Sequence, residues 1–278
     1  ALYPIKEMVF KVNRISAQKL NLRLKITKSK DELNELAQTF NHMLDRLEKS
    51  FNAQKHFVSN ISHELRTPLA AMITELELAL EDKNNPEGNI EAMLKTLDDA
   101  KKLVKLSNSL LDLAKASYDP SEIARKEIRI DEIILDASRL VQKANKNYKI
   151  DLNFDDLLAS GNELFVHGNE YLLTLAFSNV IENACKYAND RTCAVRISAK
   201  KDQAIVNFDD NGIGISPEDL PQIFEPFYRG QNRFFSDGNG IGMFLVNKII
   251  DNHNGSIQVT SELEKGTSVQ INLKRSLP

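Results

Sequence analysis

The sequence contains no tryptophan, two cysteines among its 278 residues, and no long run of apolar side chains. A membrane-spanning helix needs about 18 consecutive apolar residues, so none is predicted within the chain. Cys185 and Cys193 form no CxxC pair, which argues against both a disulfide framework and a zinc site. A net charge of -3, spread along the chain, argues against a nucleic-acid-binding surface.

The chain is long enough for two or three domains, and we expect modules at residues 1–50, 51–118 and 121–278. A helical pattern runs from Asp31 to about Leu80, broken by a weakly apolar stretch at 52–56. Its first part predicts a coiled-coil seam, formed by Leu33, Leu36, Phe40, Met43 and Leu47. A second amphipathic helix follows turn residues 82–89. Two such helices cannot cover their apolar stripes alone, so a dimeric four-helix bundle is predicted.

The first thirty residues show a different pattern. A short helix is expected after Pro4, and residues 21–26 alternate apolar and polar side chains as an extended connector would. The order of helix, connector and helix resembles the HAMP signal-relay module. A generic coiled-coil spacer is the alternative.

A reactive constellation lies within the long helix. His63 and Thr67 are four residues apart and share one face of the helix, and Glu64 can accept a proton from one histidine ring nitrogen. The other ring nitrogen is then a neutral nucleophile. Pro68 cannot donate a hydrogen bond to the Glu64 carbonyl, so a local kink is expected. The segment from Phe57 to Leu69 resembles the phospho-acceptor box of sensor histidine kinases.

Beyond a linker at 117–121, the pattern changes to mixed α and β, and it predicts strands in one sheet with helices on one face, a two-layer α/β sandwich. The expected helices cover residues 131–144, 170–188 and 241–252, and the expected strands cover 127–130, 149–154, 194–199, 204–208, 256–261 and 268–273.

The first of four motifs in this region runs from Asn179 to Tyr187. Its spacing puts Asn179, Asn183 and Lys186 on one helix face. Amide oxygens suit Mg²⁺, the lysine suits a phosphate, and the Tyr187 ring can lie beside a base. The alternative is a surface helix with polar spacing.

The second motif, Asp209 to Ile215, follows a strand. Its two glycines allow a close approach of the backbone, and a carboxylate at the strand end can accept a hydrogen bond from an exocyclic amine. A dinucleotide-binding loop is the competing interpretation. It lacks a third glycine in the required register, and residues 216–219 are expected to begin a helix instead.

The third motif, Phe224 to Arg229, is an aromatic cluster that ends in a cation. The fourth, Gly238 to Met243, precedes a helix whose free amides favour an anion. Residues 230–237 lie between them and are polar and glycine-flanked, which predicts a mobile nucleotide lid.

In this order the four motifs resemble the N, first glycine, F and second glycine boxes of the histidine-kinase ATP-binding domain, and Gly266-Thr267 resembles the family's final Gly-Thr element. That domain has a Bergerat-type ATP-binding fold, shared with gyrase, the MutL mismatch-repair proteins and the Hsp90-type chaperones. The resemblance implies a set of nucleotide-binding residues: Asn179, Asn183, Lys186, Tyr187, Asp210, Gly212, Gly214, Ile215, Arg229, Gly238, Gly240, Gly242 and Thr267.

By the same resemblance, Asp210 binds adenine, Asn183 ligates Mg²⁺, and Lys186 and Arg229 contact phosphates. The glycines of the second motif shape the adenine pocket, and those of the fourth carry the end of the lid. Asp237 stands where a glycine is common and Met243 where a leucine is common. Both departures fall on the lid, so they bear on affinity more than on activity.

Taken together, the motifs predict a multidomain α plus α/β protein: a sensor histidine kinase that transfers phosphate from ATP and Mg²⁺ to His63, then to an aspartate of a response-regulator receiver domain. The resemblance also implies a homodimer, through the hairpin and the HAMP module, and the cytoplasmic portion of a bacterial inner-membrane protein with a membrane helix upstream. Thr67 implies a phosphatase activity toward the regulator. A phosphatase-dominant member, a gyrase- or chaperone-type ATPase and a non-catalytic scaffold remain as alternatives.

Overall fold

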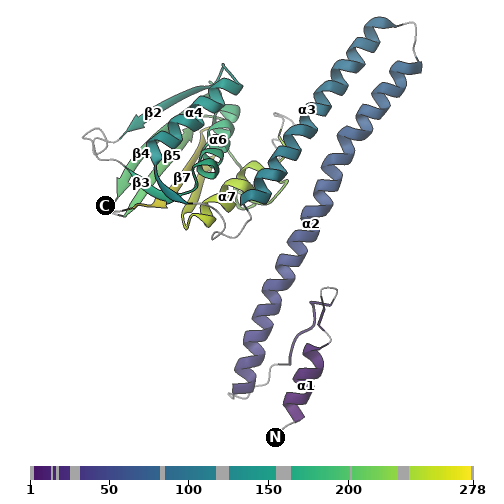
Figure 1. Cartoon of the computed structure of the whole chain (residues 1–278), viewed down its shortest axis with the longest axis vertical. Coiled ribbons are helices and arrows are strands. Elements are labelled where there is room, and N and C mark those ends of the chain that lie inside the picture. Colours follow the sequence, from purple (N-terminus) through teal and green to yellow (C-terminus); the bar gives the residue numbers. More distant parts are fainter. Residues whose placement is uncertain are drawn as a thin grey trace. The chain divides into compact units, whose positions relative to one another are not determined.

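The computed structural model describes residues 3–13, 15–16, 19–25, 32–81, 85–116, 125–154, 164–200, 202–230 and 238–276 (Figure 1). The chain divides into two compact units, Ala1–Ala71 and Met72–Pro278, and each is described by itself. Several expected features lie outside the described residues: the lid beyond Gly230, the linker at 117–121, the connector end at Ile26 and the helix start at Asp31. Within the described ranges, no helix combines the length and apolar character needed to span a membrane.

In the first unit, α1 (Tyr3–Val12) is followed by a connector without regular secondary structure at residues 22–25 and by α2 (Glu32–Glu81). The connector is held by a buried amide. Leu24 donates its N–H to Asn41 Oδ1 at 2.8 Å, and Asn41 Nδ2 donates to the Leu24 carbonyl at 3.0 Å. Asn41 shares its buried helix face with Ala37 and Leu44.

The predicted coiled-coil seam lies beside that buried face. Leu36, Met43 and Leu47 are 58%, 45% and 48% exposed, so their apolar side chains stay uncovered within one chain. The helix then continues past Pro68 to Glu81 without an interruption.

The second unit begins with the end of α2 and with α3 (Pro86–Ala116). Apolar side chains of the first half of α3 are exposed, among them Met93, Leu94 and Leu97. The C-terminal half of α3 contacts the α/β region, where Tyr171 Oη donates to Asp112 Oδ1 at 2.7 Å and Asn252 Nδ2 donates to the Ala116 carbonyl.

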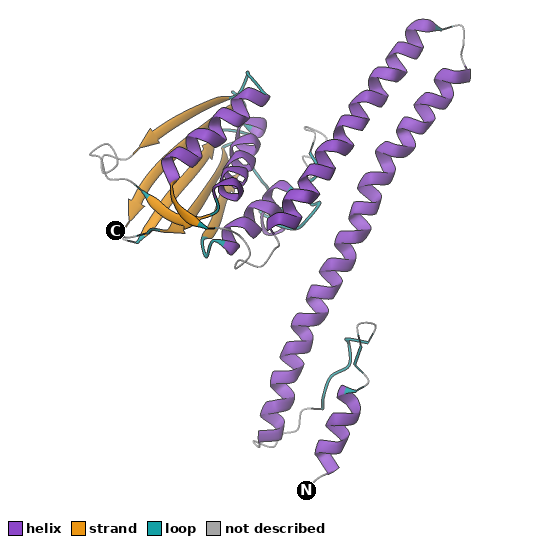
Figure 2. Cartoon of the chain, in the orientation of Figure 1, coloured by secondary structure: helices purple, strands orange, loops and turns teal. Residues whose placement is uncertain are grey.

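The α/β region is a five-stranded sheet covered on one face by α4, α6 and α7 (Figure 2). The strand order is β2-β4-β5-β7-β6, with β2 and β4 parallel and the other pairs antiparallel. Its elements are β1 (Lys126–Arg129), α4 (Ile130–Ala144), β2 (Lys149–Phe154), β3 (Phe165–Gly168), α6 (Glu170–Tyr187), β4 (Thr192–Lys200), β5 (Gln203–Asp210), α7 (Gly242–Asn252), β6 (Ser256–Glu262) and β7 (Gly266–Lys274).

The core of this region lies between α6 and the inner face of the sheet. The Phe177 ring of α6 packs 5.8 Å, centroid to centroid, from the Phe208 ring of β5, and both side chains are buried. Cys185 and Cys193 are buried free thiols on α6 and β4. Contact with Cys185 and burial raise the pKa of Cys193, so that thiol stays protonated.

Two expectations about this region were wrong. The strands do not form one sheet, because β3, which the sequence reading missed, pairs antiparallel with β1 in a separate two-stranded sheet. Residues 216–219 form a turn before a short 3₁₀ helix, Leu220–Gln222, and do not start an α-helix. The Ser216 carbonyl accepts from the amides of both Asp219 and Leu220, and Pro221 has no amide hydrogen to extend a helix.

Candidate nucleotide site and phospho-acceptor helix

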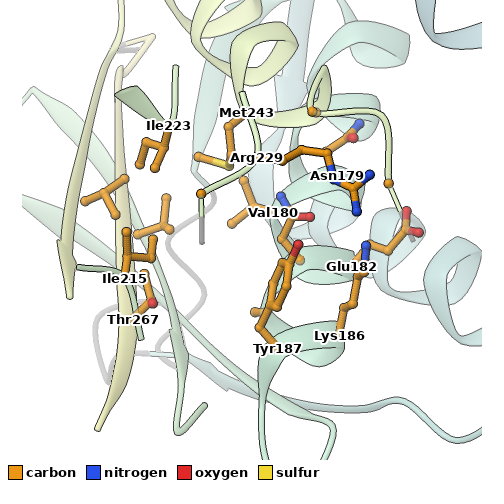
Figure 3. A pocket seen from close by; sticks show the side chains of 18 of the residues that line it. Asn179, Val180, Glu182, Lys186, Tyr187, Ile215, Ile223, Arg229, Met243 and Thr267 are labelled. Carbon is orange, nitrogen blue, oxygen red and sulfur yellow. The ribbon is translucent and has the colours of Figure 1, made fainter. Parts of the chain in front are cut away.

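A cavity lies between α6, the ends of β5 and β7, and the start of α7 (Figure 3). All the predicted nucleotide-binding residues except Gly212 line it: Asn179, Asn183, Lys186, Tyr187, Asp210, Gly214, Ile215, Arg229, Gly238, Gly240, Gly242 and Thr267. The predicted residues that line the cavity span 88 positions of the sequence, from Asn179 to Thr267.

Asp210 is held at the end of β5 by two backbone amides. Its Oδ1 accepts from the Gly212 amide at 2.8 Å and from the Thr267 amide at 3.3 Å. Burial raises the pKa of the Asp210 carboxyl, and the two amide hydrogen bonds oppose that shift. Gly212 therefore contributes to the site through its backbone, without lining the cavity. A Cβ at this position would lie 2.0 Å from the Tyr187 carbonyl oxygen, so only glycine lets the loop pack against α6.

The polar face of α6 forms a second wall. Asn179 Nδ2 donates to the Leu175 carbonyl at 2.9 Å, which leaves the amide oxygen directed toward the start of α7. A Cβ at Gly242 would lie 2.9 Å from that oxygen, and a Cβ at Gly238 would lie 3.0 Å from Lys186 Nζ. These two glycines therefore let the backbone approach the polar side chains closely.

Mostly apolar side chains form the wall of the cavity opposite α6. Figure 3 shows Ile215, Ile223 and Thr267 on one side, with Asn179, Glu182 and Lys186 on the other. Ile223 lines the cavity but carries no local sequence signal beyond its place before the aromatic motif, so it was not predicted. Lys105 and Ser109 of α3 were not predicted either, because they line the cavity from a helix about 70 residues away in sequence. Lys105 Nζ lies 3.1 Å from Glu182 Oε1.

The third and fourth motifs are joined by their backbones. The Phe227 amide donates to the Gly240 carbonyl at 2.8 Å, and both residues have a positive φ, 67° and 65°. This pairing brings Arg229 and the N-terminus of α7 to the same cavity. A carboxylate at one end with cations and amide oxygens at the other suits a ligand with an amine-bearing base and an anionic tail.

His63, Glu64 and Thr67 lie on α2 in the first unit, and all three are exposed. The Thr67 hydroxyl donates to the His63 carbonyl at 3.2 Å, as expected for residues one turn apart. Among the described residues, no hydrogen bond joins the Glu64 carboxylate to the His63 ring, so the orienting contact predicted from sequence is not formed here.

Three family models match the chain in succession. They are the HAMP domain at residues 1–49, the His Kinase A (phospho-acceptor) domain at 53–118, and the histidine kinase-, DNA gyrase B- and HSP90-like ATPase at 168–277. The chain belongs to the sensor histidine kinases. The prediction of this family, and of a helical region followed by an α/β ATPase region, is confirmed.

Among curated sensor histidine kinases, the chain is similar to ArlS of Staphylococcus aureus (strain USA300). The two are 32% identical over 273 residues, which cover 96% of this chain and 59% of ArlS. The chain thus spans about three fifths of the length of the curated relatives it matches.

Two solved histidine kinases share the fold. The Acinetobacter baumannii histidine kinase AdeS has a TM-score of 0.58 at 18% identity, covering 77% of this chain and 98% of AdeS. Full-length ShkA, solved in complex with AMPPNP, has a TM-score of 0.55 at 21% identity, covering 79% of this chain and 46% of ShkA.

Proposed function

We propose that this chain is the kinase part of a sensor that uses ATP to phosphorylate His63 and passes the phosphoryl group to an aspartate of a response-regulator receiver domain. The observation that carries the proposal is the cavity, which gathers the Asp210 carboxylate, the Asn183 amide and the Lys186 ammonium in a chain of this family.

The walls of the cavity fit a nucleotide in one orientation. Asp210, fixed by two amides, accepts a hydrogen bond from the adenine amine, while Ile215 and Tyr187 flank the base. Lys186 and Arg229 neutralise phosphate charge at the other end. Asn183, with Asn179 nearby, would hold Mg²⁺ through its amide oxygen, and the metal would supply further neutralisation of phosphate charge.

His63 is the phospho-acceptor in this proposal. One ring nitrogen attacks the γ-phosphorus in line, so that an N–P bond forms while the bond to the leaving ADP oxygen breaks. Glu64 is the adjacent carboxylate, and it would turn toward the ring from its position in the structure to accept the proton of the other ring nitrogen, so that the attacking nitrogen is neutral. The exposure of His63 supports this role, because the same ring has to meet first a nucleotide and then a receiver domain.

The exposed apolar side chains of α2 and α3 support a homodimer in which two hairpins form a four-helix bundle, with the HAMP module extending the contact. We further propose that the chain is the cytoplasmic portion of a bacterial inner-membrane protein, anchored by a transmembrane helix upstream of residue 1.

The exposed Thr67 hydroxyl, one turn beyond His63, supports a second activity, removal of phosphate from the regulator. Thr67 would orient the attacking water. The Thr67→Ala variant should keep autophosphorylation and lose most regulator dephosphorylation; an unchanged phosphatase rate would reject this role.

Incubation with γ-labelled ATP tests the kinase proposal. The parent chain should acquire a label that is acid-labile and base-stable, and His63→Gln should acquire none. His56→Gln is the matched control, because His56 is an exposed histidine one heptad earlier on the same helix. Label that persists in His63→Gln, or that disappears equally in both variants, would contradict the assignment.

A further inference from the structure

Asp219 is a buried carboxylate on the cavity wall, and it has no role in the mechanism proposed above. The residue is only 9% exposed. Its backbone is fixed by the turn before the 3₁₀ helix, where its amide donates to both the carbonyl and the hydroxyl oxygen of Ser216 at 3.1 Å. Buried charged groups are normally paired or hydrogen-bonded, so the contacts of the Asp219 carboxylate indicate its role.

Both neighbours of Arg229 lie against that carboxylate. Tyr228 Oη donates to Asp219 Oδ1 at 2.6 Å. On the other side of Arg229, a Cβ at Gly230 would lie 2.6 Å from Asp219 Oδ2, so the Gly230 backbone already lies directly against the second oxygen. One side chain therefore touches the residues on either side of a predicted phosphate-binding arginine.

We propose that Asp219 is a positioning residue for the nucleotide phosphates: by holding Tyr228 and supporting Gly230, it fixes the backbone of Arg229 where that residue lines the cavity. This inference rests on the proposed ATP-dependent function. The Phe227 amide bonds the Gly240 carbonyl and the Tyr228 amide bonds the Glu225 carbonyl, so the backbone before Arg229 is held at two points. Asp219 adds contacts with the Tyr228 side chain and with Gly230, on either side of Arg229.

A carboxylate suits this task better than an amide. Hydrogen bonds to an ionised acceptor are about twice as strong as neutral ones. The bond to Asp219 also raises the pKa of the Tyr228 hydroxyl, so the donor keeps its proton and the restraint persists at neutral and mildly alkaline pH.

The test separates phosphate recognition from base recognition. Affinities of the whole chain for ATP and for adenosine are measured by calorimetry for the parent, Tyr228→Phe and Asp219→Asn. Tyr228→Phe should weaken ATP by about 3- to 10-fold, the effect of one lost hydrogen bond, and leave adenosine unchanged. Asp219→Asn still accepts a hydrogen bond, so it should weaken ATP less. Tyr148→Phe, in the loop before β2 and outside the cavity lining, is the matched control.

A double-mutant cycle with Arg229→Ala tests the route of the effect. If Asp219 and Tyr228 act through Arg229, Tyr228→Phe should cause no further loss of ATP affinity in the Arg229→Ala background. Equal losses for ATP and adenosine, or a full additional loss in that background, would overturn the inference in favour of a purely structural role.

The Gly230→Ala variant tests the contact with the second oxygen of Asp219. The added methyl has to displace either the backbone at position 230 or the Asp219 side chain. The preference for ATP over adenosine should therefore fall in this variant as well, and the KM for ATP in autophosphorylation should rise more than kcat falls. A parent that binds no ATP would overturn the proposed function itself. A parent that binds ATP, with variants of unchanged phosphate preference, would overturn only the role of Asp219.

Discussion

The α/β region buries most of its apolar side chains within one chain, whereas the helical region, α2 and α3, leaves most of its own exposed. Helix α6 has 18 residues and buries eight of them, while α2 has 50 residues and buries only Ala37, Asn41 and Leu44. The α/β region therefore has a complete core of its own. The helices carry apolar stripes that only another surface can cover, and a second copy of the chain fits that need.

The largest expected effect is on association of the helices. Replacing both Leu94 and Leu97, 61% and 51% exposed on α3, by glutamate would place charges in the proposed bundle interface. Because each buried unpaired charge costs several kcal/mol, the dimer dissociation constant should rise by at least ~100-fold. Sedimentation equilibrium measures this, with Lys101→Glu as the control. An unchanged mass for the double variant would contradict a dimer formed through this surface.

The α/β core should respond within the single chain. Phe177→Ala removes a fully buried ring that packs on Phe208 and should lower the free energy of unfolding by about 3–5 kcal/mol. The measurement is urea unfolding of the whole chain. The transition of the α/β region is recognised because its midpoint shifts when ATP is added. Leu140→Ala, at a 55% exposed site on α4, should change it by less than about 0.5 kcal/mol. Similar losses in both variants would mean that this core is not organised around Phe177.

Asn41 is one of the three buried residues of α2, and its side-chain amide is hydrogen-bonded within its own chain. Asn41→Leu would leave both backbone groups of Leu24 unpaired, at a cost of about 1–3 kcal/mol. Amide hydrogen exchange at Leu24 should then accelerate by about 10- to 100-fold. Gln38→Leu, exposed on the same helix, should leave exchange at Leu24 unchanged; an equal acceleration there would show that the amide is not the anchor.

The smallest expected effect is a pH dependence confined to the α/β region. His253 Nε2 accepts from the Asn169 amide at 3.0 Å and Nδ1 lies 2.7 Å from the Ile249 carbonyl, so the ring is neutral with its proton on Nδ1. Burial lowers the pKa of His253 below its ordinary value of 6.5. The unfolded chain therefore takes up a proton below pH 6.5 while the folded chain does not. Stability is full above that pH and declines as pH falls toward the lowered folded pKa.

His253→Gln should remove part of that decline, seen as a smaller shift in the urea midpoint between pH 8 and pH 5.5. His167→Gln, an exposed histidine on β3, should retain the parent's shift. A parent and a His253→Gln variant with identical pH profiles would exclude His253 as the titrating group.

Much of the architecture was accessible from local pattern. The alternation in β2 and β5–β7 and the amphipathic spacing of α4, α6 and α7 placed these elements to within a few residues. Strand β3 was missed because four residues carry too little periodicity, and its partner β1 lies about 40 residues away. The predicted end of the helix at residue 252 agrees with the structure, where Asn254 takes a φ of 53° and the Gly255 amide donates to the Ile250 carbonyl at 3.0 Å.

The sequence by itself determined the chemical inventory of this protein: a histidine, a glutamate and a threonine on one helix turn, and four motifs in the order of an ATP-binding domain. These follow from spacing along the chain, which local helix and strand geometry converts directly into shared faces. Only the tertiary structure decided that Gly212 supports the nucleotide cavity from outside it and that Asp219 touches both neighbours of Arg229. Such contacts depend on how distant segments pack, and no local periodicity encodes that.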